Sequence, residues 1–115
     1  MSIKIYHNPR CSKSRETLKL LEDQGLKPEI IEYLKHPPTT AELQDILNKL
    51  GLKPRELMRV KETEYKENGL DDPSLSDAEL IEAMIRMPKL IERPIVLVNN
   101  KAAVGRPPES VLAIL

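Results

Sequence analysis

The chain has 115 residues, with 18 basic and 18 acidic side chains and a single cysteine. This length fits one domain, residues 1–115, with a core that needs neither disulfides nor structural metals. The balanced charge argues against nucleic-acid binding, so we expect a small-molecule or protein partner. Two histidines, His7 and His36, do not complete the spaced Cys/His pattern of a zinc site, and we expect neither a metal nor a bound cofactor.

The chain carries no sequence signal for export or membrane insertion. Its N-terminus, Met1–Ile5, lacks the long apolar core of a signal peptide. No apolar run approaches the roughly 18 residues that cross a bilayer. We therefore expect a cytoplasmic protein that does not contact a membrane.

The first third of the chain places a helical pattern between two short apolar runs. Ile3–Tyr6 is typical of a buried strand, Ser12–Gln24 of a helix that stops at Gly25, and Glu29–Tyr33 of a second strand. Together they have the size of a βαβ unit with parallel strands and a right-handed crossover. Ligands of such units gather at the C-terminal ends of the strands, which is where Cys11 follows the first strand.

Residues 37–90 are predicted to be mostly helical, as an insertion packed on the sheet. Thr39 with Glu42, and Ser76 with Glu79, have the spacing of capping boxes, which mark helix starts.

Between these two helices the sequence predicts a shorter helix and a turn. The shorter helix begins at Pro54 and runs past Met58, which would place Arg55 and Arg59 on one helical face. Asn68-Gly69 marks the turn that follows.

The C-terminal part is predicted to form a β-hairpin and a short helix. The apolar runs Ile95–Val98 and Ala102–Val104 flank Asn99-Asn100, two residues that suit the positive φ angles of a type I′ turn. A last short helix begins within Gly105–Glu109, because proline is acceptable in a first helical turn. The candidates for burial on this helix are Val111, Leu112, Ile114 and Leu115.

Cys11 is the candidate reactive residue. A lone cysteine is most often a small buried hydrophobe, but Arg10, Lys13 and Arg15 surround this one with cationic side chains. Ser12 is a good helix-start residue, so free helical N–H groups should point towards the sulfur. Both features favour the thiolate, and we predict that the pKa of Cys11 lies well below that of free cysteine.

The predicted order of elements resembles the thioredoxin-like plan, an α/β fold with a mixed sheet of about four strands. In that plan a cysteine follows the first strand, and an X-Pro bond precedes the third strand. Proteins of that fold usually have this proline in the cis form, against the active-site cysteine. The resemblance therefore implies a cis Arg93–Pro94 bond.

Three motifs make the chain resemble more closely the arsenate reductase family that is coupled to glutathione and glutaredoxin. They are His7-Asn8-Pro9-x-Cys11-x-x-Ser14-Arg15, Arg93-Pro94-Ile95-Val96 and Gly105-Arg106-Pro107. The resemblance implies that Cys11 is the nucleophile, that His7 lies near the thiol, and that three arginines hold the oxyanion. Those arginines are Arg59, Arg93 and Arg106, and the supporting residues are Ser14, Arg15 and Pro94.

The implied reaction is the reduction of arsenate through a thiol-arsenate adduct on Cys11. Arginine forks suit such a tetrahedral oxyanion, and nearby cations also favour a thiolate. Glutathione is then the thiol co-substrate and leaves Cys11 glutathionylated. The chain has no second cysteine, so an outside thiol must resolve this mixed disulfide, and glutaredoxin is the implied partner.

Two other functions are compatible with the sequence. A glutathione-dependent monothiol oxidoreductase would use the same low-pKa thiol without any oxyanion. A redox-sensing transcription regulator that binds RNA polymerase is the other possibility, because relatives of this fold include such regulators. This function would need a protein-binding surface.

Overall fold

The computed structural model describes residues 2–115, which form two compact units. The first unit contains the residues up to His36 together with Arg93–Leu115, and the second contains Pro37–Glu92. The segment that the sequence set apart as helical therefore packs as a unit of its own. Its description as an insertion into a single domain stays a prediction.

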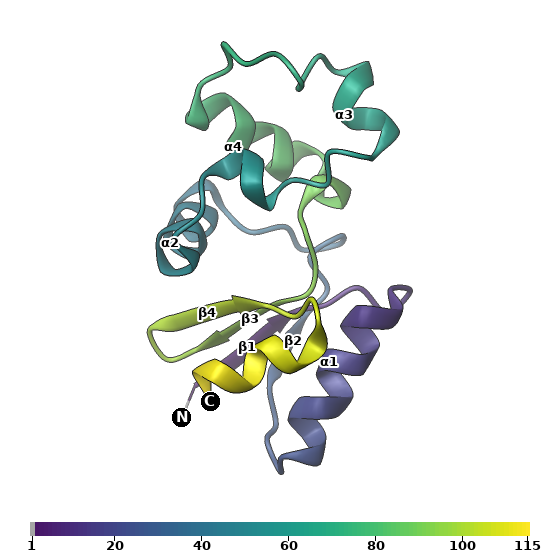
Figure 1. Ribbon diagram of the computed structural model, residues 1–115, viewed down its shortest axis with the longest axis vertical. Helices are drawn as coiled ribbons and strands as arrows, with labels where there is room; N and C mark the ends of the chain where they lie inside the picture. Colours follow the sequence, from purple (N-terminus) through teal and green to yellow (C-terminus); the bar gives the residue numbers. More distant parts are fainter. Residues whose placement is uncertain (1) are drawn as a thin grey trace. The chain divides into compact units, whose positions relative to one another are not determined.

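The first unit is built on a mixed sheet with the strand order β2-β1-β3-β4 (Figure 1). The strands are β1 (Ile3–Tyr6), β2 (Glu29–Ile31), β3 (Ile95–Val98) and β4 (Lys101–Val104). β1 pairs in parallel with β2, whereas β3 runs antiparallel to both β1 and β4. The predicted parallel strand pair and the predicted hairpin are both confirmed, although β2 ends two positions earlier than expected.

The helix α1 (Ser12–Asp23) connects β1 to β2 and buries one face in the core of the first unit. Leu21 on this face is fully buried beside Ile5, Val96 and Val111. Burial of side chains of this size contributes about 1.5–3 kcal/mol each to folding. The packing of α1 thus holds its first turn, with Cys11 immediately before it, at the C-terminal end of β1.

The last helix, η3 (Pro108–Ile114), is a 3-10 helix. Val111 is buried as predicted, but Leu112 and Leu115 are 41% and 40% exposed, so their predicted burial is wrong. In a 3-10 helix residues three apart share a face, which turns Leu112 and Leu115 together away from the core.

The hairpin turn also differs from the prediction. Asn99 has a φ of 54°, but it is the only non-glycine residue in the described part of the chain with a positive φ. A type I′ turn needs positive φ at both central residues, so Asn99-Asn100 does not form one. The peptide bond Arg93–Pro94 is cis, as predicted, and Arg106–Pro107 is cis as well.

The second unit is mostly helical, as the sequence predicted. Both capping boxes form: Thr39 and Ser76 each accept a hydrogen bond from the backbone of the glutamate three residues on. The turn at Asn68-Gly69 is also present, with Gly69 at a φ of 65°. The helices of this unit are α2 (Thr40–Leu50), η1 (Pro54–Leu57), α3 (Thr63–Glu67), α4 (Asp77–Arg86) and η2 (Pro88–Leu90), of which α3 and η2 were not predicted.

The helix that begins at Pro54 is shorter than predicted. It ends at Leu57, and Met58 has extended backbone angles of φ −89° and ψ 146° and forms a β-bridge with Ile91. The N–H of Arg59 donates to the carbonyl of Leu90 at 2.7 Å, which extends this pairing. Pairing with a distant segment therefore replaces the helix, and Arg55 and Arg59 do not share a helical face.

Within residues 2–115, no helix combines the length and the apolar character that crossing a bilayer requires.

Candidate active site

A tight turn carries the chain from β1 into α1 and presents Cys11. The backbone N–H of Cys11 donates to the carbonyl of Asn8 at 3.0 Å, with Pro9 at the second position of this turn. Proline is common at that position of a turn because its φ angle is already restricted to the required value. The side chain of Asn8 accepts a further bond from the N–H of Arg10 at 3.0 Å. Cys11 is therefore held in an ordered turn although its own side chain is partly exposed.

Cys11 occupies the N-cap position of α1, with an extended backbone at φ −94° and ψ 124°. Partial burial opposes ionisation of its thiol. Hydrogen bonds from the backbone N–H groups of Ser14 and Lys13, with the charge and a side-chain hydrogen bond of Arg93, outweigh this effect and lower the pKa of Cys11. The predicted direction of the pKa shift is thus confirmed, but the contributing cation is Arg93 in place of the neighbouring Arg10, Lys13 and Arg15.

The lowered pKa of Cys11 predicts that its alkylation extends to lower pH than that of a free cysteine. The thiolate is the reactive form, so the rate of reaction with iodoacetamide should rise with pH and reach half its maximum below the ordinary value of about 8.5. The measurement is the alkylation rate as a function of pH, followed by intact mass. A half-maximal rate at or above 8.5 would contradict the geometry described for this turn.

His7 lies at the end of β1 and is buried with Ser14. Its Nδ1 and the Oγ of Ser14 share a hydrogen bond of 2.6 Å, and the same Oγ accepts the N–H of Asn8 at 3.0 Å. Burial lowers the pKa of His7, Glu32 opposes this shift, and Arg15 adds to it. A neutral ring at pH 7 follows. In the structure His7 therefore anchors Ser14, whose backbone N–H in turn supports the thiolate of Cys11.

Arg93 and Arg106 both belong to the first unit and are in contact with each other. Arg93 reaches the thiol of Cys11, as its contribution to the lowered pKa shows. The Nη1 of Arg106 donates to the main-chain carbonyl of Arg93 at 3.3 Å. Each arginine precedes a cis peptide bond to proline, and Pro94 begins the segment that continues into β3. The structure thus brings Arg93 to the thiol of Cys11 and Arg106 to the main chain of Arg93.

Arg15 holds the cysteine turn against α1. Its Nη1 donates to the carbonyl of Pro9 at 2.9 Å, which ties the first turn of α1 to the loop before it.

Arg59 belongs to the second unit, where its guanidinium pairs with the carboxylate of Glu62 at 2.6 Å. The Nη1 of Arg59 also donates to the carbonyl of Lys89 at 3.3 Å. The side chain is thus well held within its own unit. Its role with the oxyanion stays a prediction from the resemblance.

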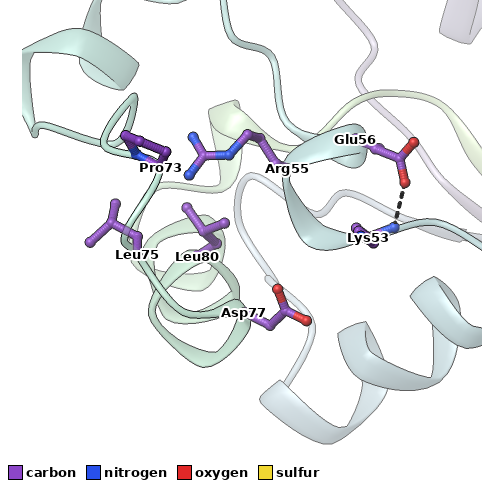
Figure 2. A pocket seen from close by; sticks show the side chains of 7 residues that line it. All are labelled: Lys53, Arg55, Glu56, Pro73, Leu75, Asp77 and Leu80. Carbon is purple, nitrogen blue, oxygen red and sulfur yellow. Dashed lines mark hydrogen bonds between the residues drawn. The ribbon is translucent and has the colours of Figure 1, made fainter.

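A cavity of about 350 Å³ lies in the second unit, and Figure 2 shows the side chains that line it. Its charged lining residues, Lys53, Arg55, Glu56 and Asp77, carry both signs. The guanidinium of Arg55 donates to the hydroxyl of Tyr65 and to the carbonyls of Leu70 and Asp72. Its donors are therefore engaged in holding the loop, and this cavity lacks the excess of cations that an oxyanion site requires.

Some contacts at the cysteine turn were not predictable from the sequence. Glu32, which acts on His7, and Thr17, whose hydroxyl lies 3.5 Å from the carbonyl of Gly105, had no recognisable motif. The Gly-Arg-Pro motif was visible, but it did not reveal which residue packs so closely that only glycine fits at position 105.

Among residues 2–115, no three His, Cys, Asp or Glu side chains gather in a way that could hold a metal ion.

Comparison with known proteins gives consistent matches along nearly the whole chain. A family model described as the ArsC family matches residues 6–114. The chain is 59% identical over 114 residues to the uncharacterized protein YfgD of Escherichia coli, covering 98% of this chain and 96% of that protein. It is 57% identical over 114 residues to an arsenate reductase of Neisseria meningitidis serogroup A, covering 98% and 97% of the two chains.

A solved structure of an arsenate reductase from Vibrio cholerae superposes with a TM-score of 0.98 at 57% identity and covers 100% of this chain and 98% of that one. This similarity, with the mixed four-stranded sheet, confirms the predicted α/β class and the thioredoxin-like fold. The match in sequence and in structure identifies the chain as a member of the ArsC family.

Proposed function

We propose that this protein is an arsenate reductase with Cys11 as its nucleophile. The observation that carries the proposal is the position of the Cys11 thiol at the start of α1, where backbone N–H groups and Arg93 lower its pKa. Membership of the ArsC family and the names of the similar proteins support the same assignment. Arg93 and Arg106 supply paired N–H donors that suit a tetrahedral oxyanion, and Arg59 is assigned to it by the family resemblance.

The proposed reaction balances as a two-electron reduction. The Cys11 thiolate attacks the arsenic atom, an S–As bond forms, and one arsenic oxygen leaves as water after protonation. The thiolate of glutathione then attacks the sulfur of Cys11, so that an S–S bond forms while the S–As bond breaks and leaves its electron pair on arsenic. Cys11 and glutathione together lose two electrons as they form a mixed disulfide, and arsenic passes from As(V) to As(III) and leaves as arsenite.

External thiols are proposed to restore the enzyme, because Cys11 is the only cysteine in the chain. A thiolate must attack the mixed disulfide, and this chain cannot supply a second one. We therefore propose glutaredoxin as the partner that removes glutathione from Cys11. The need for reduced glutathione favours a cytoplasmic location.

The direct test is arsenite production from arsenate with glutathione and glutaredoxin present. The wild-type protein should produce arsenite in repeated turnovers, whereas Cys11→Ser should not exceed the reaction without enzyme, since a serine hydroxyl is a much weaker nucleophile at neutral pH. Serine differs from cysteine by a single atom, so it is a matched control for the fold. Equal arsenite production by both proteins would exclude Cys11 as the nucleophile.

A glutathione-dependent monothiol oxidoreductase is the second candidate, because an activated thiol without a second cysteine is also sufficient for disulfide exchange. The arginines distinguish the two functions. Reduction of a glutathionylated peptide that persists in an Arg106→Ala variant, in the absence of any arsenate reduction by the wild-type protein, would favour this second function.

A further inference from the structure

Thr17 is a buried polar residue on α1, the helix whose N-cap is Cys11. Its side chain is fully buried, and its hydroxyl donates to the carbonyl of Lys13 at 2.8 Å. The same hydroxyl lies 3.5 Å from the carbonyl of Gly105, at the end of β4. Thr17 therefore connects the helix that presents Cys11 with the segment that precedes Arg106.

Gly105 approaches α1 so closely that no side chain fits at this position. A Cβ atom there would lie 2.5 Å from the Oγ1 of Thr17 and 2.9 Å from the Cγ of Pro94. The backbone N–H of Gly105 also donates to the carbonyl of Pro94 at 2.9 Å. The three residues thus form one close contact, which we call the Thr17 contact.

The Thr17 contact lies next to both arginines of the first unit. Pro94 follows Arg93 in the chain, and Gly105 precedes Arg106, whose guanidinium is bound to the carbonyl of Arg93. A displacement of Gly105 from α1 would therefore move both arginines relative to the thiol. No residue of the contact itself carries a charge, so it acts by position alone.

We propose that Thr17 is a positioning residue, whose hydroxyl sets the place of Arg93 beside the thiol of Cys11 and of Arg106 beside Arg93. Its effect on oxyanion binding rests on the proposed function, whereas its effect on the thiol does not. Without the hydroxyl, Gly105 loses the oxygen atom that its backbone packs against on α1, and Arg93 loses part of its hold beside the sulfur. The thiolate is then less stabilised, and the oxyanion meets arginines that are less well placed.

Thr17→Ala and Thr17→Ser form a matched pair for the test. Both variants lose the methyl group, but only serine keeps the hydroxyl. Thr17→Ala should raise the pKa of Cys11 and should raise the KM for arsenate by about tenfold. The pKa is measured from the rate of iodoacetamide alkylation as a function of pH. This is below the roughly hundredfold loss that a misplacement of about 1 Å can cause. Thr17→Ser should stay close to wild type in both measurements.

Thermal unfolding of the same variants separates positioning from stability. A role in stability alone predicts that Thr17→Ala melts at a lower temperature while the pKa of Cys11 remains that of the wild type, and this result would overturn the proposal. Equal shifts in the alanine and serine variants would also overturn it, because the hydroxyl would then not matter. If the wild-type protein does not reduce arsenate, the proposed function fails, but the pKa comparison still decides the role of Thr17.

Discussion

Replacing Arg93 by alanine should both raise the pKa of Cys11 and weaken the binding of arsenate. The charge and the hydrogen bond of this arginine stabilise the thiolate in the structure, and both are lost in the variant. Loss of one charge-assisted contact costs ~1.5–3 kcal/mol, or roughly tenfold to more than a hundredfold in anion affinity. The two measurements are alkylation of Cys11 against pH and the concentration dependence of protection of the thiol by arsenate.

Two further variants, Arg93→Lys and Arg106→Ala, provide the controls for this prediction. Arg93→Lys should recover part of both effects, because lysine keeps the charge but not the planar fork. Arg106→Ala should weaken arsenate binding with a smaller change in the thiol, since the contact described for Arg106 is with the carbonyl of Arg93. If Arg93→Ala left both the pKa of Cys11 and the affinity for arsenate unchanged, the proposed oxyanion site would be wrong.

Arsenite production should stop after about one turnover per chain when glutathione is present and glutaredoxin is absent. The mixed disulfide on Cys11 has no second cysteine to attack it, and a catalyst of exchange is needed to release it quickly. The measurement is arsenite formed against time, with glutaredoxin added after the reaction has slowed. Production should resume on this addition. Steady turnover at an undiminished rate without glutaredoxin would contradict the proposed partner.

Local sequence signals predicted the part of the site that depends on neighbouring residues. Ser12 beside Cys11 indicated a helix start, and the structure has α1 beginning at Ser12. The capping boxes at Thr39 and Ser76 form for the same reason, because each needs only a side chain and the backbone three residues away. Such motifs carry their partners within one turn of helix.

Contacts between distant segments were beyond these signals. The pairing of Met58 with Ile91 ended a helix that local propensity would have continued, and it removed the shared face predicted for Arg55 and Arg59. The hydroxyl of Thr17 meets a residue 88 positions away in the chain. A threonine inside a helix has no pattern that names its partner, so its role follows only from the folded structure.

The resemblance added what neither kind of signal contains. The cis bond before Pro94 was implied by the resemblance to the thioredoxin-like fold. Of all X-Pro bonds in folded proteins, only about 5–6% are cis. The resemblance also assigned Arg93 and Arg106 to the site before the fold was known. In the structure Arg93 acts on the thiol of Cys11, and Arg106 donates to the main-chain carbonyl of Arg93.

The central claim is that Cys11 is the nucleophile and that the reaction passes through a mixed disulfide. Its most direct test is the intact mass of the protein in the reaction that has stopped without glutaredoxin. Arsenate and glutathione are supplied without glutaredoxin, and the arsenite formed is measured in the same sample. The account predicts one glutathione on Cys11 for each arsenite released, and neither product with Cys11→Ser. More than one arsenite formed per protein molecule, with Cys11 unmodified throughout, would contradict the account.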